Sequence, residues 1–389
     1  MLCNNDSDME SLRIAIFTDT FLPARDGVVT YTVTLRKELE RLGHEVIIAT
    51  TARSVTSREY DHNVYTSRGY KFPLYPQYCI SPVPFSVNKK IMDQKVDIVH
   101  SQTPLMMGYA ALRYSKLKEI PCVSTFHSLI FDESVLNAFL PDNRITIGMV
   151  ERIMKRYLKW HYLKCSETIA PSEYVKELLS HELSVNAKIV NNAIDVYRYF
   201  PTMSKSEARK RLNLDDSSKI VLFLGRISRE KNLEVLLKAA KLASGDIRFL
   251  IIGSGPHLSY YKDMARNLGL TNVDFLGFID DALAPLYFQA ADLFCNPSNF
   301  EVMSTVDVES LAAGTPILVP DGTSQVELLF DGKAGMSFTN ADPGDLNSKI
   351  NEMLCSGKSF STIECAKKFT PESHVEALLT VYRNAMDKR

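Results

Sequence analysis

The sequence predicts an α/β protein of two doubly wound, Rossmann-like domains, each built on a parallel sheet. Strand and helix patterns alternate along the chain, and the alternation begins again near residue 219. Strands that alternate with helices form a parallel sheet covered on both faces. The chain has 389 residues, 45% of them hydrophobic, so it is long enough to bury two cores. Ligands of such sheets bind beyond the carboxyl ends of the strands, so candidate site residues are sought there.

Each half of the chain supplies its own strands. In the first half a helical pattern over 29–43 stops at Gly43, a residue type that commonly follows a helix. The polar, proline-containing segment 191–210 separates the halves and is the natural linker, which places the domains at 1–192 and 193–370. The predicted strands lie within 13–19, 44–50, 96–102, 120–128 and 167–172 in the first half, and within 219–226, 247–255, 273–279, 292–298 and 315–320 in the second.

Composition limits the partners and the compartment. With a net charge of -1, no nucleic-acid partner is expected, and attraction to an anionic membrane requires a local basic patch. The seven cysteines are scattered without a C-x-x-C pair, which favours a reducing compartment and argues against a disulfide framework or a zinc knuckle. The polar, acidic start does not match a secretory signal, and no apolar run reaches the roughly 20 residues of a membrane span. A cytoplasmic protein is therefore predicted.

Two cations follow the first strand of the second half. Arg226 comes directly after the strand, and Lys231 lies just before the next helix. At this edge of a sheet they suit a phosphate or diphosphate, which Arg226 can bind through two parallel hydrogen bonds. Ordinary surface charge on a solvated loop explains the pair equally well.

Three further positions have both a functional and a structural explanation. Gly253, in a Gly-Ser-Gly turn after the next strand, allows a ligand close to the backbone, but a tight turn also explains it. Gly27 opens the first helix, where backbone N–H groups can face an anion, or it is only a turn residue. His127 ends an apolar strand and can bond a substrate hydroxyl or carbonyl, whereas a neutral core histidine satisfied by the backbone is the simpler explanation.

The stretch 298–319 carries two acids, Glu301 and Glu309, with seven residues between them. A helix that begins near Ser304 or Thr305, with one of them as its cap, places Glu301 in the loop and Glu309 a turn into the helix. The free N–H groups at its start point to the same edge of the sheet as the two cations. Cations and a helix N-terminus suit a diphosphate, and acids accept from vicinal sugar hydroxyls. Together these features predict a nucleotide-sugar site.

On these residues the chain resembles the retaining, nucleotide-sugar-dependent glycosyltransferases of family 4, whose GT-B fold has a deep cleft between two domains. The E-x7-E spacing in FEVMSTVDVES (300–310) and the cation pair in GRISREKN (225–232) carry the resemblance, which extends over nearly the whole chain. It implies that domain 1–192 binds the acceptor and domain 193–370 binds the donor. It also implies that a C-terminal helix over about 371–389 packs back on the first domain.

The resemblance implies a role for each predicted position. Glu309 would bind the ribose hydroxyls, and Phe278 and Ile279 would lie next to the nucleotide base. The catalytic set, which holds the diphosphate and touches the transferred sugar, is His127, Arg226, Lys231 and Glu301. The remaining donor-binding positions are Gly27, Gly253, Ser304 and Thr305.

The mechanism implied for this family is front-face attack, in which the leaving phosphate helps to take the acceptor proton. The two cations and the helix N-terminus stabilise the charge on the departing diphosphate, so no metal or other cofactor is expected. The D-x-D-like string at 6–8 precedes the first strand and is discounted as a metal site. Two positions depart from the family pattern. Ser304 stands where glycine is usual, and Asp26 precedes a lone Gly27 and is unfavourable beside a diphosphate.

The acceptor has to be inferred from the first half of the chain. The cationic helix expected over 149–165 suits an anionic membrane surface, but an ordinary domain helix with a solvated basic face is the competing explanation. The aromatic- and proline-rich segment 70–90 can line an apolar entrance. The first half looks most like enzymes that glycosylate diacylglycerol or phosphatidylinositol-type lipids, which favours a lipid acceptor at the inner face of the plasma membrane. The expected apolar positions of the helix are Ile153, Met154, Tyr157, Leu158 and Tyr162, and the expected membrane-facing ones are Arg152, Lys155, Arg156, Lys159 and Trp160.

The expected donor is a UDP- or GDP-linked hexose. Two other functions stay open. One is a soluble glycosyltransferase that acts on a sugar, a sugar phosphate or a polysaccharide. The other, of a different class, is a sugar-nucleotide epimerase or a non-catalytic sugar-nucleotide binder.

Overall fold

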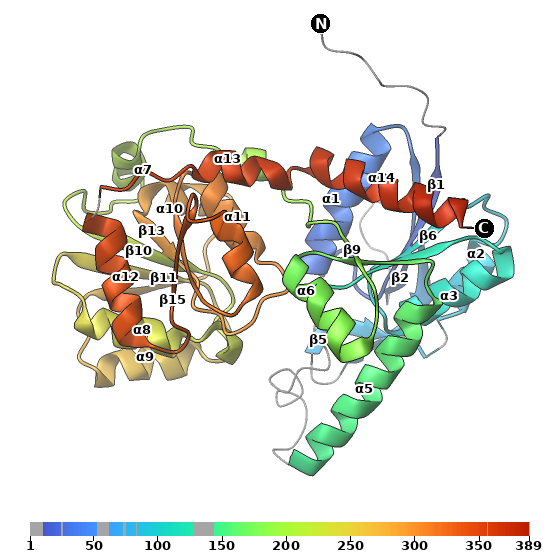
Figure 1. Ribbon diagram of the computed structural model, residues 1–389, viewed down its shortest axis with the longest axis horizontal. Helices are drawn as coiled ribbons and strands as arrows, with labels where there is room; N and C mark the ends of the chain where they lie inside the picture. Colours follow the sequence, from blue (N-terminus) through green and yellow to red (C-terminus); the bar gives the residue numbers. More distant parts are fainter. Residues whose placement is uncertain are drawn as a thin grey trace, which may run out of the picture. The chain divides into compact units, whose positions relative to one another are not determined.

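The chain divides into two compact units, one of residues 1–193 with 371–389 and one of residues 194–370 (Figure 1). The computed structural model describes residues 11–24, 26–52, 62–72, 75–82, 84–127, 144–355 and 357–388. Each unit is described by itself.

The first unit is built on a seven-stranded sheet in which every pairing is parallel. A separate antiparallel pair, β4 (Tyr70–Phe72) and β5 (Tyr75–Ile80), occupies part of the aromatic- and proline-rich segment 70–90. In spatial order the strands of the main sheet are β3 (Val64–Arg68), β2 (Glu45–Ala52), β1 (Arg13–Thr18), β6 (Ile98–Ser101), β7 (Cys122–Thr125), β8 (Glu167–Ala170) and β9 (Lys188–Ile189). The main helices are α1 (Gly27–Arg41), α2 (Ser86–Lys90), α3 (Met106–Lys118), α5 (Arg144–Lys164), α6 (Glu173–Leu178) and α14 (Pro371–Asp387).

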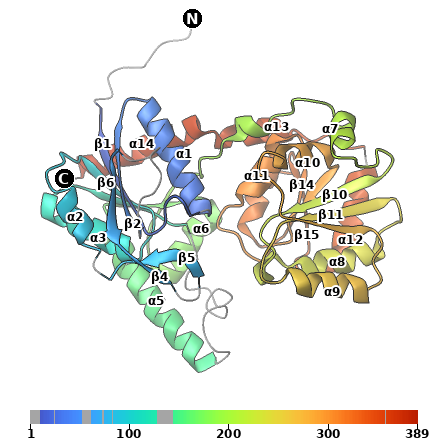
Figure 2. The same cartoon turned by 180° about the vertical axis from the view of Figure 1, so that it is seen from behind.

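The apolar run of β1 explains why this sheet is covered on both faces. Successive side chains of a strand point to opposite faces. Ile14 and Ile16 pack in one cluster with residues of α1 and α14, and Ala15 and Phe17 pack in another with residues of α3. Both views show α14 beside α1, so the last helix of the chain completes the first unit (Figures 1 and 2).

The second unit has a six-stranded parallel sheet. Its β10 is also covered on both faces, because Ile220 and Leu222 pack in one cluster while Val221 and Phe223 pack in the other. The two doubly wound parallel sheets that the sequence predicts are confirmed. In spatial order its strands are β12 (Val273–Gly277), β11 (Ile247–Ile252), β10 (Lys219–Leu224), β13 (Leu293–Cys295), β14 (Ile317–Pro320) and β15 (Gly335–Phe338). Its helices are α7 (Lys205–Arg211), α8 (Leu233–Leu242), α9 (Leu258–Asn267), α10 (Ala284–Ala290), α11 (Thr305–Ala312), α12 (Pro343–Cys355) and α13 (Thr362–Ala366).

The strand order defines where each unit can bind a ligand. In each sheet the first strand lies inside, with the next two strands on one side and the later strands on the other. The order therefore reverses between β1 and β6 in the first unit and between β10 and β13 in the second. Ligands of open α/β sheets bind in the crevice beyond the carboxyl ends of the strands at this reversal.

Candidate functional site

The reversal point of the second unit brings together residues predicted to bind the donor. Lys231 lies in the loop after β10 and Glu301 in the loop after β13, and the Nζ of Lys231 forms an ion pair with Oε1 of Glu301. Both side chains are partly buried, with exposed fractions of 19% and 16%. Arg226, at the start of the same β10 loop, is exposed. Burial lowers the pKa of Lys231, but Glu301 and nearby acids outweigh it and raise that pKa, so Lys231 is a cation at neutral pH.

Several hydrogen bonds join these two loops. Asn299 donates its backbone N–H to the carbonyl of Glu230 at 3.0 Å, and the amide of Asn232 donates to the side-chain oxygen of Asn299 at 2.9 Å. On the other side, Ser324 Oγ donates to the carbonyl of Glu301 at 2.6 Å. The position of Glu301 is therefore fixed by its own backbone as well as by Lys231.

A buried acid that was not among the predicted site residues, Asp307, supports the loop that carries Glu301. Asp307, in the first turn of α11, is fully buried. Its two oxygens accept from Asn296 Nδ2 at 3.0 Å and Gln325 Nε2 at 2.8 Å. Burial raises the pKa of Asp307 to about 7, although the bonds from Gln325 and Asn296 act in the opposite direction. The sequence signal was the spacing Ser304-x-x-Asp307, which is typical of helix N-termini.

Ser304 caps α11 as predicted, and Thr305 is the first residue of that helix. Ser304 Oγ accepts the backbone N–H of Asp307 at 3.3 Å and a bond from Asn296 at 3.1 Å. The φ of Ser304 is −78°, so the backbone here does not need the glycine that the family pattern usually has. The Ser304 hydroxyl, which a glycine would lack, belongs to the hydrogen-bond network around Asp307.

Glu309 lies in the same helix and is partly buried. Burial raises its pKa to about 7, while a hydrogen bond from Tyr199 and the charge of Arg198 lower it. Tyr199 is buried and comes from the short helix Val196–Tyr199 at the start of this unit. The structure thus gives the predicted ribose ligand a neutral hydrogen-bond donor from another element.

The glycine turn after β11 has a structural role within the unit. Gly253 has a φ of +138°, and a Cβ there would lie 1.8 Å from the carbonyl oxygen of Gly225. A Cβ on Gly255 would lie 2.2 Å from the carbonyl oxygen of Ile227. The close backbone approach expected for a ligand at Gly253 is thus made by the neighbouring loop, and the tight-turn explanation accounts for this glycine.

The two residues predicted to meet the nucleotide base differ in exposure. Phe278, just after β12, is 69% exposed, whereas Ile279 packs against one of the two cores of the unit. Phe278 can therefore offer a ring face to a ligand, whereas Ile279 is partly buried against the core.

His127 in the first unit is held by side chains, whereas the simpler explanation expected backbone partners. Its Nε2 is 2.6 Å from Gln102 Oε1, and its ring makes an edge contact with Tyr31 at a centroid distance of 4.7 Å. Burial lowers the pKa of His127 to about 3, with a smaller effect of His374. His127 is therefore neutral at physiological pH, and one ring nitrogen is an acceptor.

The start of α1 is occupied by Asp26. Its Oδ1 accepts the backbone N–H of Val29 at 2.9 Å, and its Oδ2 accepts from Thr20 at 2.8 Å. A negative charge already caps this helix, so the geometry does not favour the approach of a diphosphate that was expected at Gly27. A Cβ on Gly27 would meet no atom within 4 Å.

The exposed face of α5 is both apolar and basic. Of the expected apolar positions, Ile153 is 56% exposed, whereas Leu158 and Tyr162 are buried. Lys155 was expected to face a membrane, but it is only partly exposed, and its Nζ binds Glu151 at 2.7 Å and Glu182 at 2.6 Å. The exposed residues of α5 are Ile145, Gly148, Met149, Arg152, Ile153, Arg156, Lys159, Trp160, Leu163 and Lys164, and we call them the α5 face.

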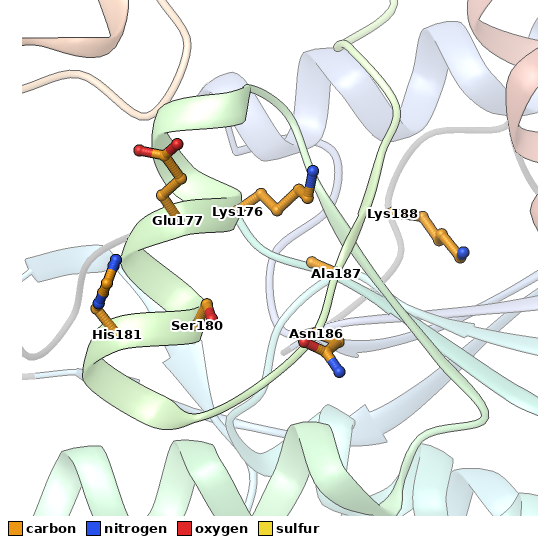
Figure 3. A pocket seen from close by; sticks show the side chains of 7 residues that line it. All are labelled: Lys176, Glu177, Ser180, His181, Asn186, Ala187 and Lys188. Atoms are coloured by element: carbon orange, nitrogen blue, oxygen red, sulfur yellow. The ribbon is translucent and has the colours of Figure 1, made fainter.

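Other features of the described residues do not add to this site. Among them, no group of three His, Cys, Asp or Glu side chains is placed to hold a metal ion, and no helix is both long and apolar enough to cross a bilayer. A surface pocket of about 420 Å³ lies in the first unit, lined by α6, the helical turn after it and the segment leading into β9 (Figure 3). None of the predicted site residues lines it.

Models of known families and curated relatives match nearly the whole chain. The model described as Glycosyltransferase Family 4 matches residues 25–198, and that described as Glycosyl transferases group 1 matches residues 204–368. An alpha-monoglucosyldiacylglycerol synthase of Streptococcus pneumoniae is 31% identical over 88% of this chain and 78% of its own. A synthase of the same name from Acholeplasma laidlawii is 27% identical over 97% of this chain and 98% of its own. A phosphatidyl-myo-inositol mannosyltransferase of Mycobacterium leprae is 26% identical over 88% of this chain and 87% of its own.

Solved structures show the same fold. A sucrose-phosphate synthase from Thermosynechococcus elongatus superimposes with a TM-score of 0.80 at 20% identity, over 97% of this chain and all of the other. The Anabaena protein HepE, solved in complex with UDP and glucose, gives a TM-score of 0.72 at 18% identity, over 95% of this chain and 99% of the other. Two parallel-sheet domains and these neighbours define the GT-B fold. The chain belongs to glycosyltransferase family 4, and it is a glycosyltransferase.

Proposed function

We propose that this enzyme transfers a hexose from a UDP- or GDP-linked sugar to a membrane lipid of the diacylglycerol type, with retention of anomeric configuration. The Lys231–Glu301 pair at the strand reversal carries the donor half of the proposal, because it places a cation and a hydroxyl acceptor side by side. An ammonium has three N–H groups, so Lys231 can keep its bond to Glu301 and still donate to a diphosphate. Arg226 adds a second charge from the same loop.

The proposed roles follow from the chemistry of each side chain. Glu301 accepts hydroxyls of the transferred sugar, and Glu309, once ionised, accepts those of the ribose. The first N–H groups of α11 face the departing phosphate. In the reaction the bond between the sugar C1 and the phosphate oxygen breaks, and the electron pair leaves with the diphosphate. The acceptor oxygen bonds C1 on the same face, and its proton passes to a leaving phosphate oxygen.

The cations of this loop stabilise the leaving charge in the same way that a metal ion does in other transferases. We therefore propose that transfer does not require a metal. The measurement is product formation in excess EDTA, with added Mg²⁺ as the comparison. Loss of activity in EDTA that Mg²⁺ restores would overturn this part.

The α5 face supports the lipid acceptor and a location at the inner surface of the plasma membrane. It combines five apolar residues with four cations and no acid. An ordinary domain helix would turn a polar face to solvent, whereas this mixture suits insertion among anionic headgroups. Two relatives named for glucosylation of diacylglycerol agree with this choice of acceptor.

A transfer assay tests the proposal. Radiolabelled UDP-glucose and GDP-mannose are offered with diacylglycerol in phosphatidylglycerol vesicles, with glucose and glucose phosphate as soluble acceptors. We expect one donor to label the lipid and NMR of the product to show retention. Label only in a soluble product would favour the soluble transferase. Epimerised donor, or binding without turnover, would favour the remaining alternatives.

A further inference from the structure

A buried polar cluster lies behind His127 at the carboxyl edge of the first unit's sheet. It joins β6, β7, α1 and α14, and none of its other members has a role in the proposed reaction. The six residues are each 4% exposed or less: His100, Gln102, Thr125, Tyr31, His374 and Tyr382. Buried donors and acceptors must be paired correctly, so the direction of each hydrogen bond here can be worked out.

The direction is fixed at one end by a backbone carbonyl. His374 Nδ1 is 2.5 Å from the carbonyl oxygen of Asn191, which can only accept, so Nδ1 carries the proton. Burial lowers the pKa of His374 to about 4, so the ring is neutral and its Nε2 accepts from the hydroxyl of Tyr31 at 3.0 Å. The Tyr31 hydroxyl thus donates its single proton to His374 and can only accept from any further partner. The side chain of Thr125 lowers the pKa of Tyr31 through a hydrogen bond, which means that Thr125 donates to the phenol oxygen.

The same argument continues to His127. Thr125 Oγ1 is 2.7 Å from His100 Nε2 and, having donated its own proton, accepts from that nitrogen. His100 Nδ1 is then the unprotonated ring nitrogen. It accepts from the amide of Gln102 at 3.2 Å and from the hydroxyl of Tyr382 at 2.7 Å. This turns Gln102 Oε1 toward His127 Nε2, at 2.6 Å, which must carry a proton.

We infer that Gln102 and the hydrogen-bonded residues behind it are positioning residues. They hold His127 as the Nε2–H tautomer and leave its Nδ1 as an acceptor for a ligand hydroxyl. His127 then selects a group that donates a hydrogen bond, such as a sugar or lipid hydroxyl, over a carbonyl or phosphate oxygen. The inference rests on the proposed function in that His127 contacts substrate. It also gives α14 a task beyond packing, since His374 sets the direction of the chain.

Nuclear magnetic resonance of the full-length enzyme labelled with ¹⁵N-histidine tests the tautomer without reference to activity. Long-range ¹H–¹⁵N correlations distinguish a protonated Nε2 from a protonated Nδ1, and the His127→Gln variant identifies the signals of His127. We expect a protonated Nε2 at pH 7. A protonated Nδ1 would overturn the inference.

Activity gives the second readout. Gln102→Leu removes the acceptor, and we expect a fall of about tenfold in kcat/KM, the factor for loss of about one hydrogen bond.

Gln102→Glu keeps an acceptor but adds a charge that raises the pKa of His127. The His127 ring faces Tyr31 and Gln102; His374 is near enough to lower its pKa, and His100 lies behind Gln102.

Protonated His127 cannot accept at Nδ1, so Gln102→Glu should be active at high pH and lose activity as pH falls through the raised pKa. Gln94→Glu, the same change at a residue bonded to Tyr65, is the matched control and should keep the wild-type pH profile. An equal loss for Gln102→Glu at every pH would indicate a purely structural role and overturn the inference. A protonated Nε2 together with normal transfer by His127→Gln would overturn the hydroxyl contact alone.

Discussion

Lys231 and Glu301, which are 70 positions apart in the chain, form a partly buried ion pair where the strand order of the second unit reverses. Parallel strands deliver their following loops to one edge of the sheet, so a cation after β10 and an acid after β13 meet there. The charge of Glu301 raises the pKa of Lys231 and so stabilises the ammonium form of that residue. The pair therefore links the stability of the two loops to the chemistry proposed for them.

Removal of either partner should affect both stability and transfer. Lys231→Met or Glu301→Gln leaves a partly buried polar group without its partner, so we expect a loss of about 1–3 kcal/mol in the free energy of unfolding. Transfer should fall by about a hundredfold or more, because both residues are proposed to contact the donor. Urea titration and initial rates measure the two effects.

The double variant Lys231→Met/Glu301→Gln should lose less stability than the sum of the single changes, since they remove one interaction. Lys238→Met is the control, because its pair with Glu234 is solvent-exposed and should contribute less than about 1 kcal/mol. Additive single changes would show that the pair does not stabilise the fold.

Asp307 should make stability depend on pH. Its pKa is raised to about 7 from an ordinary value of 3.8, so the folded state binds its proton more tightly than the unfolded state does. The tighter proton binding adds to the free energy of unfolding. This stabilisation is fully present below about pH 4 and is lost as pH rises through about 7. Asp307→Asn cannot titrate, so the difference in unfolding free energy, wild type minus variant, should decrease from pH 5 to pH 8. A difference that does not change over this range would refute the raised pKa.

Tyr199 should tune the binding of the nucleotide through Glu309. Ribose hydroxyls donate to the ionised carboxylate, whose pKa is about 7, so UDP or GDP binding should strengthen as pH rises through that value. Tyr199→Phe removes a hydrogen bond that favours ionisation, so the midpoint should move to higher pH. Calorimetric titration between pH 6 and pH 9 measures it. An unchanged midpoint would mean that Glu309 does not bind the ribose.

Sequence reasoning found the edge of the sheet but not the interactions beneath it. Alternating strands and helices locate loops such as those of Lys231 and Glu301, because the rule depends only on chain order. Asp307 was missed because an acid after a helix cap usually faces solvent, and its amide partners lie 11 and 18 positions away. His374 bonds Tyr31 across 343 positions, a pairing that no local pattern encodes.

The ion pairs of Lys155 were missed for a similar reason. Helical spacing separated apolar from basic positions on α5, but it could not show that Glu182, from the turn after α6, would pair with one of the lysines. Several short strands were not predicted. The β4–β5 pair lies in a stretch whose polar and apolar residues alternate poorly, and β15 is a four-residue strand that begins with glycine. Short elements of this kind are defined by their neighbours more than by their own residues.

Gly27 and Gly253 should respond differently to the same change. Gly253→Ala forces a side chain against a backbone carbonyl at a positive φ, so we expect a loss of at least about 2 kcal/mol in unfolding free energy. Gly27→Ala meets open space at a helix start and should leave stability equal or slightly higher. If a ligand approaches Gly27, transfer should fall in this stable variant. Full activity would remove Gly27 from the site.

The α5 face should control binding to anionic vesicles. Arg152→Glu/Arg156→Glu reverses two exposed charges and should abolish sedimentation with phosphatidylglycerol vesicles at low salt. Wild type should bind, and should bind less at high salt because the attraction is screened.

Removal of the apolar part of the face, Ile153→Ser/Trp160→Ser, should weaken binding at every salt concentration, because insertion of apolar side chains does not depend on screening. Lys155→Ala is the matched control on the same helix. Its ammonium is already paired with Glu151 and Glu182, so vesicle binding should be unchanged. Donor hydrolysis in solution should be equal in all these variants. Vesicle binding that survives both double changes would place the membrane contact on another surface and leave the lipid acceptor without its support from α5.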